Sequence, residues 1–191
     1  MEWYAIDKDY VNYLKKYDEF VPNIDYKNKM KCFLGVVLTT DNVDYFAPLT
    51  SYKPKFINMK NDIDFFKIQD KNTDKIFGAI DINNMIPVMP ENYTKLTLDN
   101  LDQFREFDNE REKKSYWKLL QKESELINEK EILMNAEKLY HLKEQHPENN
   151  IAKRCCDFKL LEEKCFDYNH DIKEEITENL DNDYNHDDFE R

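Results

Sequence analysis

The sequence predicts an α+β fold, in which a twisted, mostly antiparallel sheet or small barrel is followed by packed helices. Short β-prone runs separated by turn residues occupy residues 32–89. From about Leu101 to Gln145 the chain has neither glycine nor proline, and apolar residues recur three or four positions apart. Strands that precede helices, rather than alternating with them, are typical of this fold class.

The first half is expected to contribute all of the strands and one helix. The strands are expected at residues 3–6, 32–39, 43–49, 64–68, 75–82 and 85–89. Asp7 or Asp9 can cap the helix, which runs to about Phe20 because Pro22 follows. Pro87 marks a bulge or an edge in the last strand.

The second half is expected to be helical. Two helices account for residues 101–145, with a break near Asn128 or Asn135, and a last helix runs over about residues 151–168. Residues 1–168 are therefore predicted to form one domain. Residues 169–191 are acidic and rich in asparagine, which predicts a flexible tail.

Composition excludes several classes of protein. The 191 residues include only two glycines, Gly35 and Gly78, so neither a P-loop nor a Rossmann phosphate loop can be written. The longest apolar run has six residues, far fewer than the roughly 20 that cross a bilayer, and no signal peptide is apparent. A cytoplasmic protein with no membrane contact is expected. The four cysteines lack zinc-site spacing and are expected to be reduced and buried.

The charge is unevenly distributed. The chain carries a net charge of -12, of which residues 167–191 contribute -8. Residues 26–60 instead hold six lysines and two aspartates. A local basic surface, suited to an anionic partner, is therefore possible in the sheet half despite the overall acidity.

The segment Thr50-Ser51-Tyr52-Lys53-Pro54-Lys55 places two hydroxyls beside two ammonium groups. Such donors can hold a phosphate and stabilise negative charge in a transition state. A second basic loop, residues 26–31, brings lysines together with Tyr26, whose ring could stack on a base. An ordinary lysine-bearing surface loop is the alternative interpretation. No histidine lies in the sheet half, and no metal or cofactor site is expected.

An ordered set of segments resembles the ToxN/AbiQ family, the endoribonuclease toxins of type III toxin–antitoxin systems, with the AbiQ branch the closer match. Two of these segments are Lys31-Cys32-Phe33-Leu34-Gly35 and Pro48-Leu49-Thr50-Ser51-Tyr52-Lys53. The whole set comprises residues 3–6, 10–14, 21–23, 31–38, 45–53, 78–88 and 158–164.

The resemblance implies a core similar to the Kid/MazF toxins and a metal-independent endoribonuclease that functions in phage abortive infection. It implies products with a 2′,3′-cyclic phosphate and a 5′-hydroxyl. It also implies an RNA antitoxin of tandem repeats, which the toxin cuts into pseudoknot units and holds in a closed toxin–RNA assembly. Cellular or phage RNA would be the other substrate.

The resemblance assigns catalysis to Thr50, Ser51 and Lys53, and RNA binding to Lys31 and Tyr26. Lys55 matches no family motif. Lys29 and Lys55 are assigned to RNA binding from their places in the basic loops. In this scheme the 2′-hydroxyl attacks the adjacent phosphorus, Lys53 contacts the scissile phosphate, and Ser51 donates a hydrogen bond rather than acting as a nucleophile.

Two alternatives remain open at this point. A non-catalytic RNA-binding or partner-binding protein could use the same basic loops, because gripping RNA needs the same donors as cutting it. The acidic tail could mimic nucleic acid or block the groove instead of only solubilising the chain.

Overall fold

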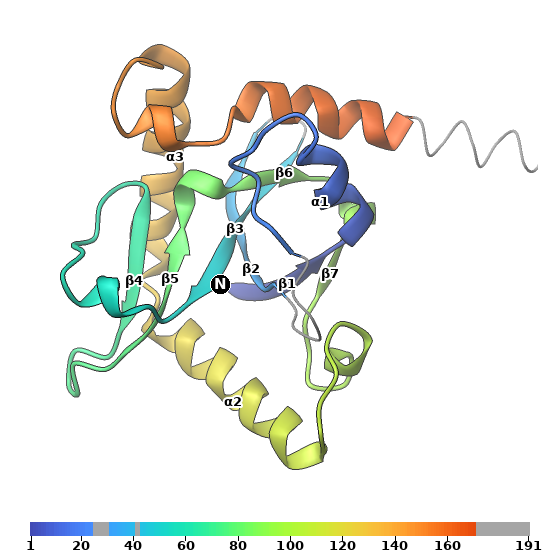
Figure 1. Cartoon of the computed structure of the whole chain (residues 1–191), viewed down its shortest axis with the longest axis vertical. Coiled ribbons are helices and arrows are strands. Elements are labelled where there is room, and N and C mark those ends of the chain that lie inside the picture. Colours follow the sequence, from blue (N-terminus) through green and yellow to red (C-terminus); the bar gives the residue numbers. More distant parts are fainter. Residues whose placement is uncertain (25–30, 41–42, 171–191) are drawn as a thin grey trace, which may run out of the picture.

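A computed structural model describes residues 1–24, 31–40 and 43–170. These residues contain a seven-stranded sheet in which every pairing is antiparallel (Figure 1), so the predicted fold class is confirmed. The strands are β1 (Glu2–Ile6), β2 (Phe33–Thr39), β3 (Asp44–Ser51), β4 (Phe65–Gln69), β5 (Ile76–Asp81), β6 (Ile86–Val88) and β7 (Tyr93–Lys95). Their order is β4-β5-β3-β2-β1-β7, with β6 paired to β3.

Strand β3 organises the sheet because it has three partners. One edge pairs with β2, and the other pairs first with β6 and then with β5. The end of β3 therefore lies between β2 and β5, with Thr50 opposite Ala79 and Ser51 opposite Gly78. The Leu49 backbone N–H donates to the Cys32 carbonyl at 2.9 Å, which places the start of β2 alongside the end of β3.

Gly78 is required by the close approach of β3 to β5. A Cβ added at this position would lie 2.6 Å from the Thr50 carbonyl oxygen. We expect Gly78→Ala to lower the free energy of unfolding by about 1–3 kcal/mol, because backbone must move to relieve the overlap. Denaturant titration measures this change, and an unchanged midpoint would contradict the register described here.

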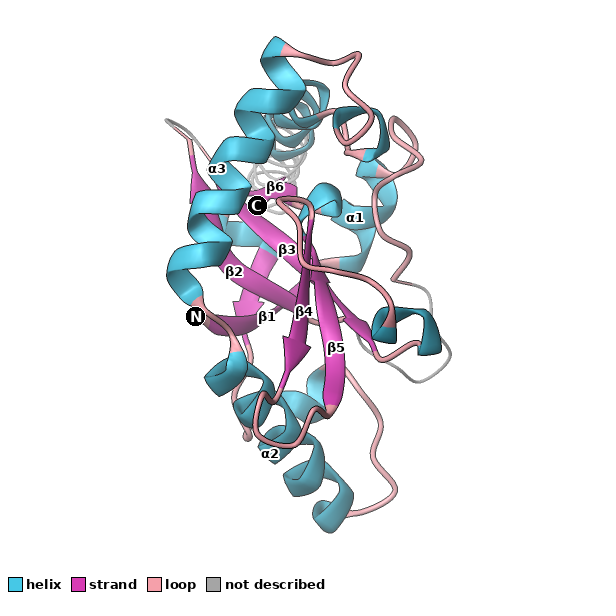
Figure 2. Cartoon of the chain, turned by 90° about the vertical axis from the view of Figure 1, so that its left-hand side faces the viewer, coloured by secondary structure: helices cyan, strands magenta, loops and turns pink. Residues whose placement is uncertain are grey.

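The described residues form four α-helices, which pack around the strands. They are α1 (Lys8–Leu14), α2 (Glu110–Leu126), α3 (Glu129–Gln145) and a last helix whose described part is residues 158–170. Each contributes apolar side chains to one core, among them Leu14, Leu120, Leu139 and Leu161. Figure 2 shows α1, α2 and α3 around the sheet. The two-helix interpretation of residues 101–145 is confirmed with its break at Asn128, which caps α3.

Three helix boundaries were predicted wrongly, and at each of them a side-chain oxygen accepts a hydrogen bond from a backbone N–H: Asp18 for Phe20, Asn109 for Glu112 and Asp157 for Leu160. α1 ends at Leu14 rather than near Phe20, because the Asp18 carboxylate accepts backbone hydrogen bonds from Phe20 and Asp157 at 2.8 and 2.6 Å. α2 begins at Glu110 rather than Leu101, because Asn109 caps it and Glu112 reaches back to the Asp108 N–H.

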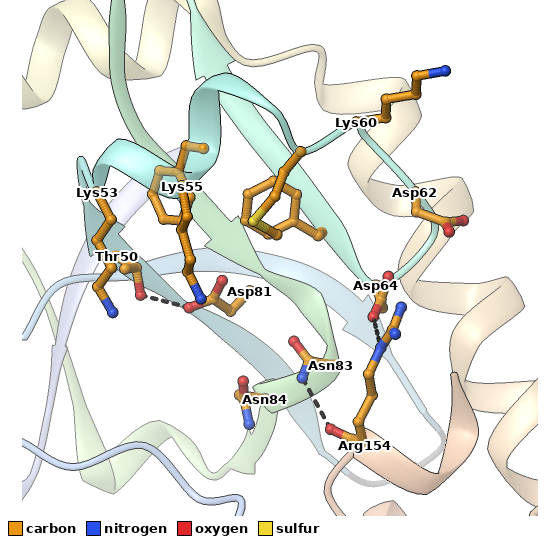
Figure 3. Close-up of a pocket in the computed structure, with 13 residues that line it drawn as sticks. Thr50, Lys53, Lys55, Lys60, Asp62, Asp64, Asp81, Asn83, Asn84 and Arg154 are labelled. Atoms are coloured by element: carbon orange, nitrogen blue, oxygen red, sulfur yellow. Dashed lines mark hydrogen bonds and ion pairs between the residues drawn. The ribbon is translucent and has the colours of Figure 1, made fainter. Parts of the chain in front are cut away.

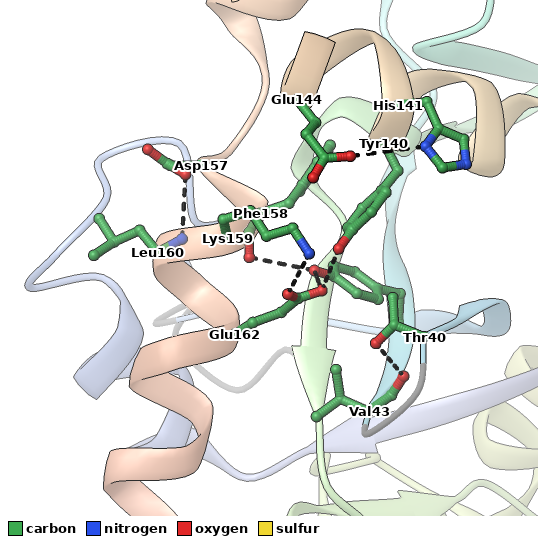
Figure 4. Close-up of polar contacts among 11 residues, drawn as sticks. Thr40, Val43, Tyr140, His141, Glu144, Asp157, Phe158, Lys159, Leu160 and Glu162 are labelled. Carbon is green, nitrogen blue, oxygen red and sulfur yellow. Dashed lines mark hydrogen bonds and ion pairs between the residues drawn. The ribbon is translucent and has the colours of Figure 1, made fainter.

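The last helix begins at residue 158, after a 3-10 turn at Ala152–Arg154, instead of near residue 151. Glu162 fixes this helix to the rest of the domain: its Oε1 accepts hydrogen bonds from the hydroxyls of Tyr45 and Tyr140 at 2.8 and 2.7 Å (Figure 4). The helix therefore docks through a buried polar contact as well as through apolar packing.

All four cysteines are free and buried, as predicted. No helix among the described residues is long and apolar enough to cross a membrane. Residues 169 and 170 belong to the last helix, and the remainder of the predicted acidic tail lies outside the described residues.

Candidate active site

A cavity of about 440 Å³ opens where β3 and β5 end (Figure 3). Polar and charged side chains make up most of its lining, and Phe56, Met59 and Phe65 add an apolar wall. The polar and charged lining residues are Thr50, Lys53, Lys55, Lys60, Asp62, Asp64, Asp81, Asn83, Asn84 and Arg154.

Thr50 is the centre of a hydrogen-bonded chain at one end of this cavity. Its Oγ1 donates to Asp81 Oδ2 at 2.5 Å, and Lys31 Nζ donates to the same Oγ1 at 3.4 Å. Asp81 is the last residue of β5, and Lys31 precedes β2 by two positions. Three neighbouring strands thus bring an ammonium, a hydroxyl and a carboxylate into contact.

Burial shifts the pKa values of Asp81 and Lys31, the two charged groups of this hydrogen-bonded set, in opposite directions. It raises the pKa of Asp81, against the hydrogen bond from Thr50 and the charge of Lys31, which both lower it. Burial lowers the pKa of Lys31, against the opposing effect of Asp81, and the positive charge of Lys53 lowers it further. Lys31 therefore loses its proton more readily than an ordinary lysine. A lowered lysine pKa is suited to general acid–base catalysis.

Removing the Asp81 charge is expected to shift a pH profile. Because the Asp81 carboxylate raises the pKa of Lys31, Asp81→Asn lowers that pKa further, and Lys31 loses its charge at a lower pH. We expect the alkaline limb of the pH profile of kcat/KM to move to lower pH in this variant, because the charged form of Lys31 is the one expected to act. Asp62→Asn removes a carboxylate from the same cavity without this effect, so equal shifts in both variants would contradict the assignment.

The structure brings together most of the described residues that the sequence assigned to the site. Figure 3 shows Lys53 and Lys55 extending from the segment after β3 towards Thr50 and Asp81. Ser51 is exposed and does not line the cavity, since successive side chains of a strand point to opposite faces. Tyr26 and Lys29 lie outside the described residues.

The sequence did not identify Asp81 or Arg154 as members of the site. Asp81 lies within a segment that carried the family resemblance, directly after a β-prone run, and that position was a usable signal. Arg154 had no such signal, because it reaches the cavity only through the packing of the turn before the last helix.

Comparison with known proteins identifies the family of this chain. The family model described as toxin ToxN of type III toxin–antitoxin systems matches residues 2–165. The chain belongs to this toxin family. Endoribonuclease ToxN of Pectobacterium atrosepticum is 31% identical over 175 residues, which cover 88% of this chain and 94% of the relative. Endoribonuclease AbiQ of Lactococcus lactis subsp. lactis is 29% identical over 173 residues, with 86% and 87% covered.

Solved structures of similar fold agree with this assignment. The anti-phage endoribonuclease AbiQ superposes with a TM-score of 0.74 at 26% identity, covering 88% of this chain and 98% of its own. A protein from a bacterial antiviral system that a processed non-coding RNA regulates superposes with a TM-score of 0.73 at 30% identity, covering 87% and 98%. This ToxN-family chain is therefore an endoribonuclease, and the non-catalytic alternative is set aside.

Proposed function

We propose that this toxin cleaves RNA without a metal ion, by attack of a ribose 2′-hydroxyl on the adjacent phosphorus. The products are a 2′,3′-cyclic phosphate and a 5′-hydroxyl. Because the RNA supplies its own nucleophile, the protein has to align the reacting atoms and stabilise the charge that builds up on the phosphoryl oxygens.

The observation that supports this scheme is the chain Lys31–Thr50–Asp81 with Lys53 beside it at one end of the cavity. Lys53 binds a non-bridging oxygen of the scissile phosphate. Thr50, fixed by Asp81, positions the same phosphate. Charged Lys31 donates a proton to the departing 5′-oxygen as its bond to phosphorus breaks, and the attacking 2′-hydroxyl loses its proton to solvent. Lys55 contacts the flanking backbone.

Product analysis tests the chemistry. Purified protein is incubated with RNA, and the new ends are mapped by mass spectrometry and by labelling with polynucleotide kinase. We expect cyclic phosphate and 5′-hydroxyl ends, formed at the same rate in EDTA. Loss of cleavage in EDTA with recovery on adding magnesium would refute the metal-free scheme.

Ser51 keeps its catalytic role as a proposal that rests on the family resemblance. Tyr26 is proposed as an RNA contact on the same grounds, and Lys29 is proposed as one from its place in the basic loop. We expect Ser51→Ala to lower kcat by about 10²-fold if its hydroxyl donates to the reacting phosphate. Ser115→Ala, which removes an exposed hydroxyl from α2, is the matched control and leaves kcat unchanged. A Ser51→Ala variant with the parent rate would remove Ser51 from the catalytic set.

An RNA pseudoknot is the proposed inhibitor. A solved structure from a bacterial type III toxin–antitoxin system, in which a non-coding RNA pseudoknot selectively inhibits the toxin, superposes on this chain with a TM-score of 0.72 at 26% identity. We expect this toxin to cut a repeat transcript into such units and to bind them in a closed assembly, with activity against phage. Native mass spectrometry of toxin mixed with its repeat RNA measures the stoichiometry.

A further inference from the structure

Arg154 lies at the opposite end of the cavity from Lys53 and Lys55 (Figure 3). It ends the 3-10 turn Ala152–Arg154, and two hydrogen bonds fix this turn to the sheet half. Asn83 Nδ2 donates to the Arg154 carbonyl at 2.9 Å, and the Cys156 N–H donates to the Asn83 carbonyl at 2.9 Å. Because Asn83 follows Asp81 by two residues, Arg154 is held at a fixed place relative to the Thr50–Asp81 pair.

The guanidinium is oriented by Asp64. Arg154 Nε donates to Asp64 Oδ2 at 2.5 Å, and the side chain of Arg154 is still 53% exposed. No described residue accepts a hydrogen bond from its two terminal nitrogens. Arg154 is thus anchored through one nitrogen, and its two terminal nitrogens are left to donate to a ligand, an arrangement that suits bidentate binding of a phosphate.

Asp64 has an unfavourable environment that stability alone does not explain. Asp64 is 4% exposed, and its Oδ1 is buried without a hydrogen-bond partner among the described residues. A buried carboxylate with one unsatisfied oxygen destabilises a fold, and an apolar residue of similar volume is often as good or better. The pairing gains a purpose if Asp64 serves to hold Arg154 in one orientation.

The distribution of charge shows which ligand fits. Among the described residues, four cations and three carboxylates line the cavity, and two of the carboxylates, Asp64 and Asp81, are already hydrogen-bonded to Arg154 and Thr50. Cations therefore remain at both ends of the cavity, where they can bind two successive phosphates of a single strand. Phe56, Met59 and Phe65 form the apolar part of the lining of the same cavity.

We infer that Arg154, oriented by Asp64, forms a second phosphate subsite, which binds the backbone phosphate next to the one being cut. This inference rests on the proposed function, in which Lys53 and Thr50 hold the scissile phosphate. Arg154 then contributes to substrate binding and to the position of the strand, and it takes no part in bond breaking.

Arg154→Gln tests the subsite against Lys153→Gln, a matched control that removes one positive charge from the neighbouring exposed residue outside the cavity. We expect Arg154→Gln to raise KM about tenfold with kcat within about twofold of the parent, and to reduce the salt dependence of binding by about one counterion. Lys153→Gln is expected to leave both unchanged. Equal effects of the two variants would overturn the inference.

Single methylphosphonate substitutions locate the contact. In the parent, neutralising one phosphate beside the cut is expected to raise KM about tenfold, and in Arg154→Gln the same substitution is expected to have little further effect. Asp64→Asn, which keeps the shape but weakens the anchor, is expected to give an intermediate sensitivity. If Arg154 contacted a base instead, each flanking methylphosphonate would raise KM by the same factor in Arg154→Gln as in the parent. This result would overturn the subsite.

These measurements separate the inference from the proposed chemistry. Product ends other than cyclic phosphate would refute the chemistry, while the KM effect of Arg154→Gln could still be measured. Cyclic ends with an unchanged KM would refute the subsite alone. If Arg154→Gln fails to fold, the methylphosphonate scan is carried out on the parent and on Asp64→Asn. The subsite requires that neutralising one phosphate raises the KM of the parent and raises the KM of Asp64→Asn by a smaller factor. Any other result would overturn the subsite.

Discussion

A single 2′-deoxynucleotide immediately 5′ of the cut is expected to abolish cleavage at that site, by at least about 10⁴-fold. The substitution removes the proposed nucleophile and leaves the phosphates, the bases and their contacts with Lys53 and Arg154 in place. Neither water nor a protein side chain is positioned in this scheme to replace an intramolecular attack. Single-turnover cleavage of a synthetic RNA of mapped cut site measures the loss, with direct binding measured in parallel.

The matched control is the same RNA with the 2′-deoxy substitution two nucleotides away, which is expected to be cut at close to the parent rate. Binding of both RNAs should be similar, since most contacts in the proposed site are to phosphate. Residual cleavage of the first RNA with a linear 3′-phosphate would instead indicate attack by water or by a side chain such as Ser51. Mass spectrometry of the protein would then show whether a covalent adduct forms.

Local features of the chain were predictable from the sequence because they depend on neighbours in the sequence. The β2–β3 hairpin follows from two β-prone runs with turn residues between them, and the α3 boundary follows from the capping side chain of Asn128. The same reasoning placed Thr50 and Lys53 at the end of a strand, and the structure places both in the cavity.

Contacts between distant segments were not predictable in this way. Thr50 meets Asp81, 31 positions later, only because β3 pairs with β5 in one register, and no local pattern specifies that pairing. Arg154 and Asp64 are 90 positions apart and meet through the packing of a short turn. The prediction of the end of α1 was wrong for a related reason. The Asp18 carboxylate, which competes with the helix for backbone N–H groups, also accepts a hydrogen bond from the distant Asp157 N–H.

Lys53→Ala is expected to lower kcat by about 10²–10³-fold, the cost of removing one group that stabilises charge in the transition state. Lys53 lines the cavity beside Thr50 and is close enough to Lys31 and Asp81 for its charge to affect the pKa of both. The extra negative charge on the phosphoryl oxygens exists only in the transition state, so KM is expected to change much less than kcat. Single-turnover rates at saturating RNA measure the loss directly.

Lys60→Ala is the matched control, because it removes the same charge from the same cavity while Figure 3 shows the Lys60 side chain pointing away from Thr50 and Asp81. We expect a small change in KM and the parent kcat. The two variants also differ in pH dependence: Lys53 lowers the pKa of Lys31, so its removal raises that pKa and moves the alkaline limb of the rate profile to higher pH. If both variants lost kcat equally, Lys53 would act through the general attraction of RNA to a basic cavity, and the role in the transition state would be wrong.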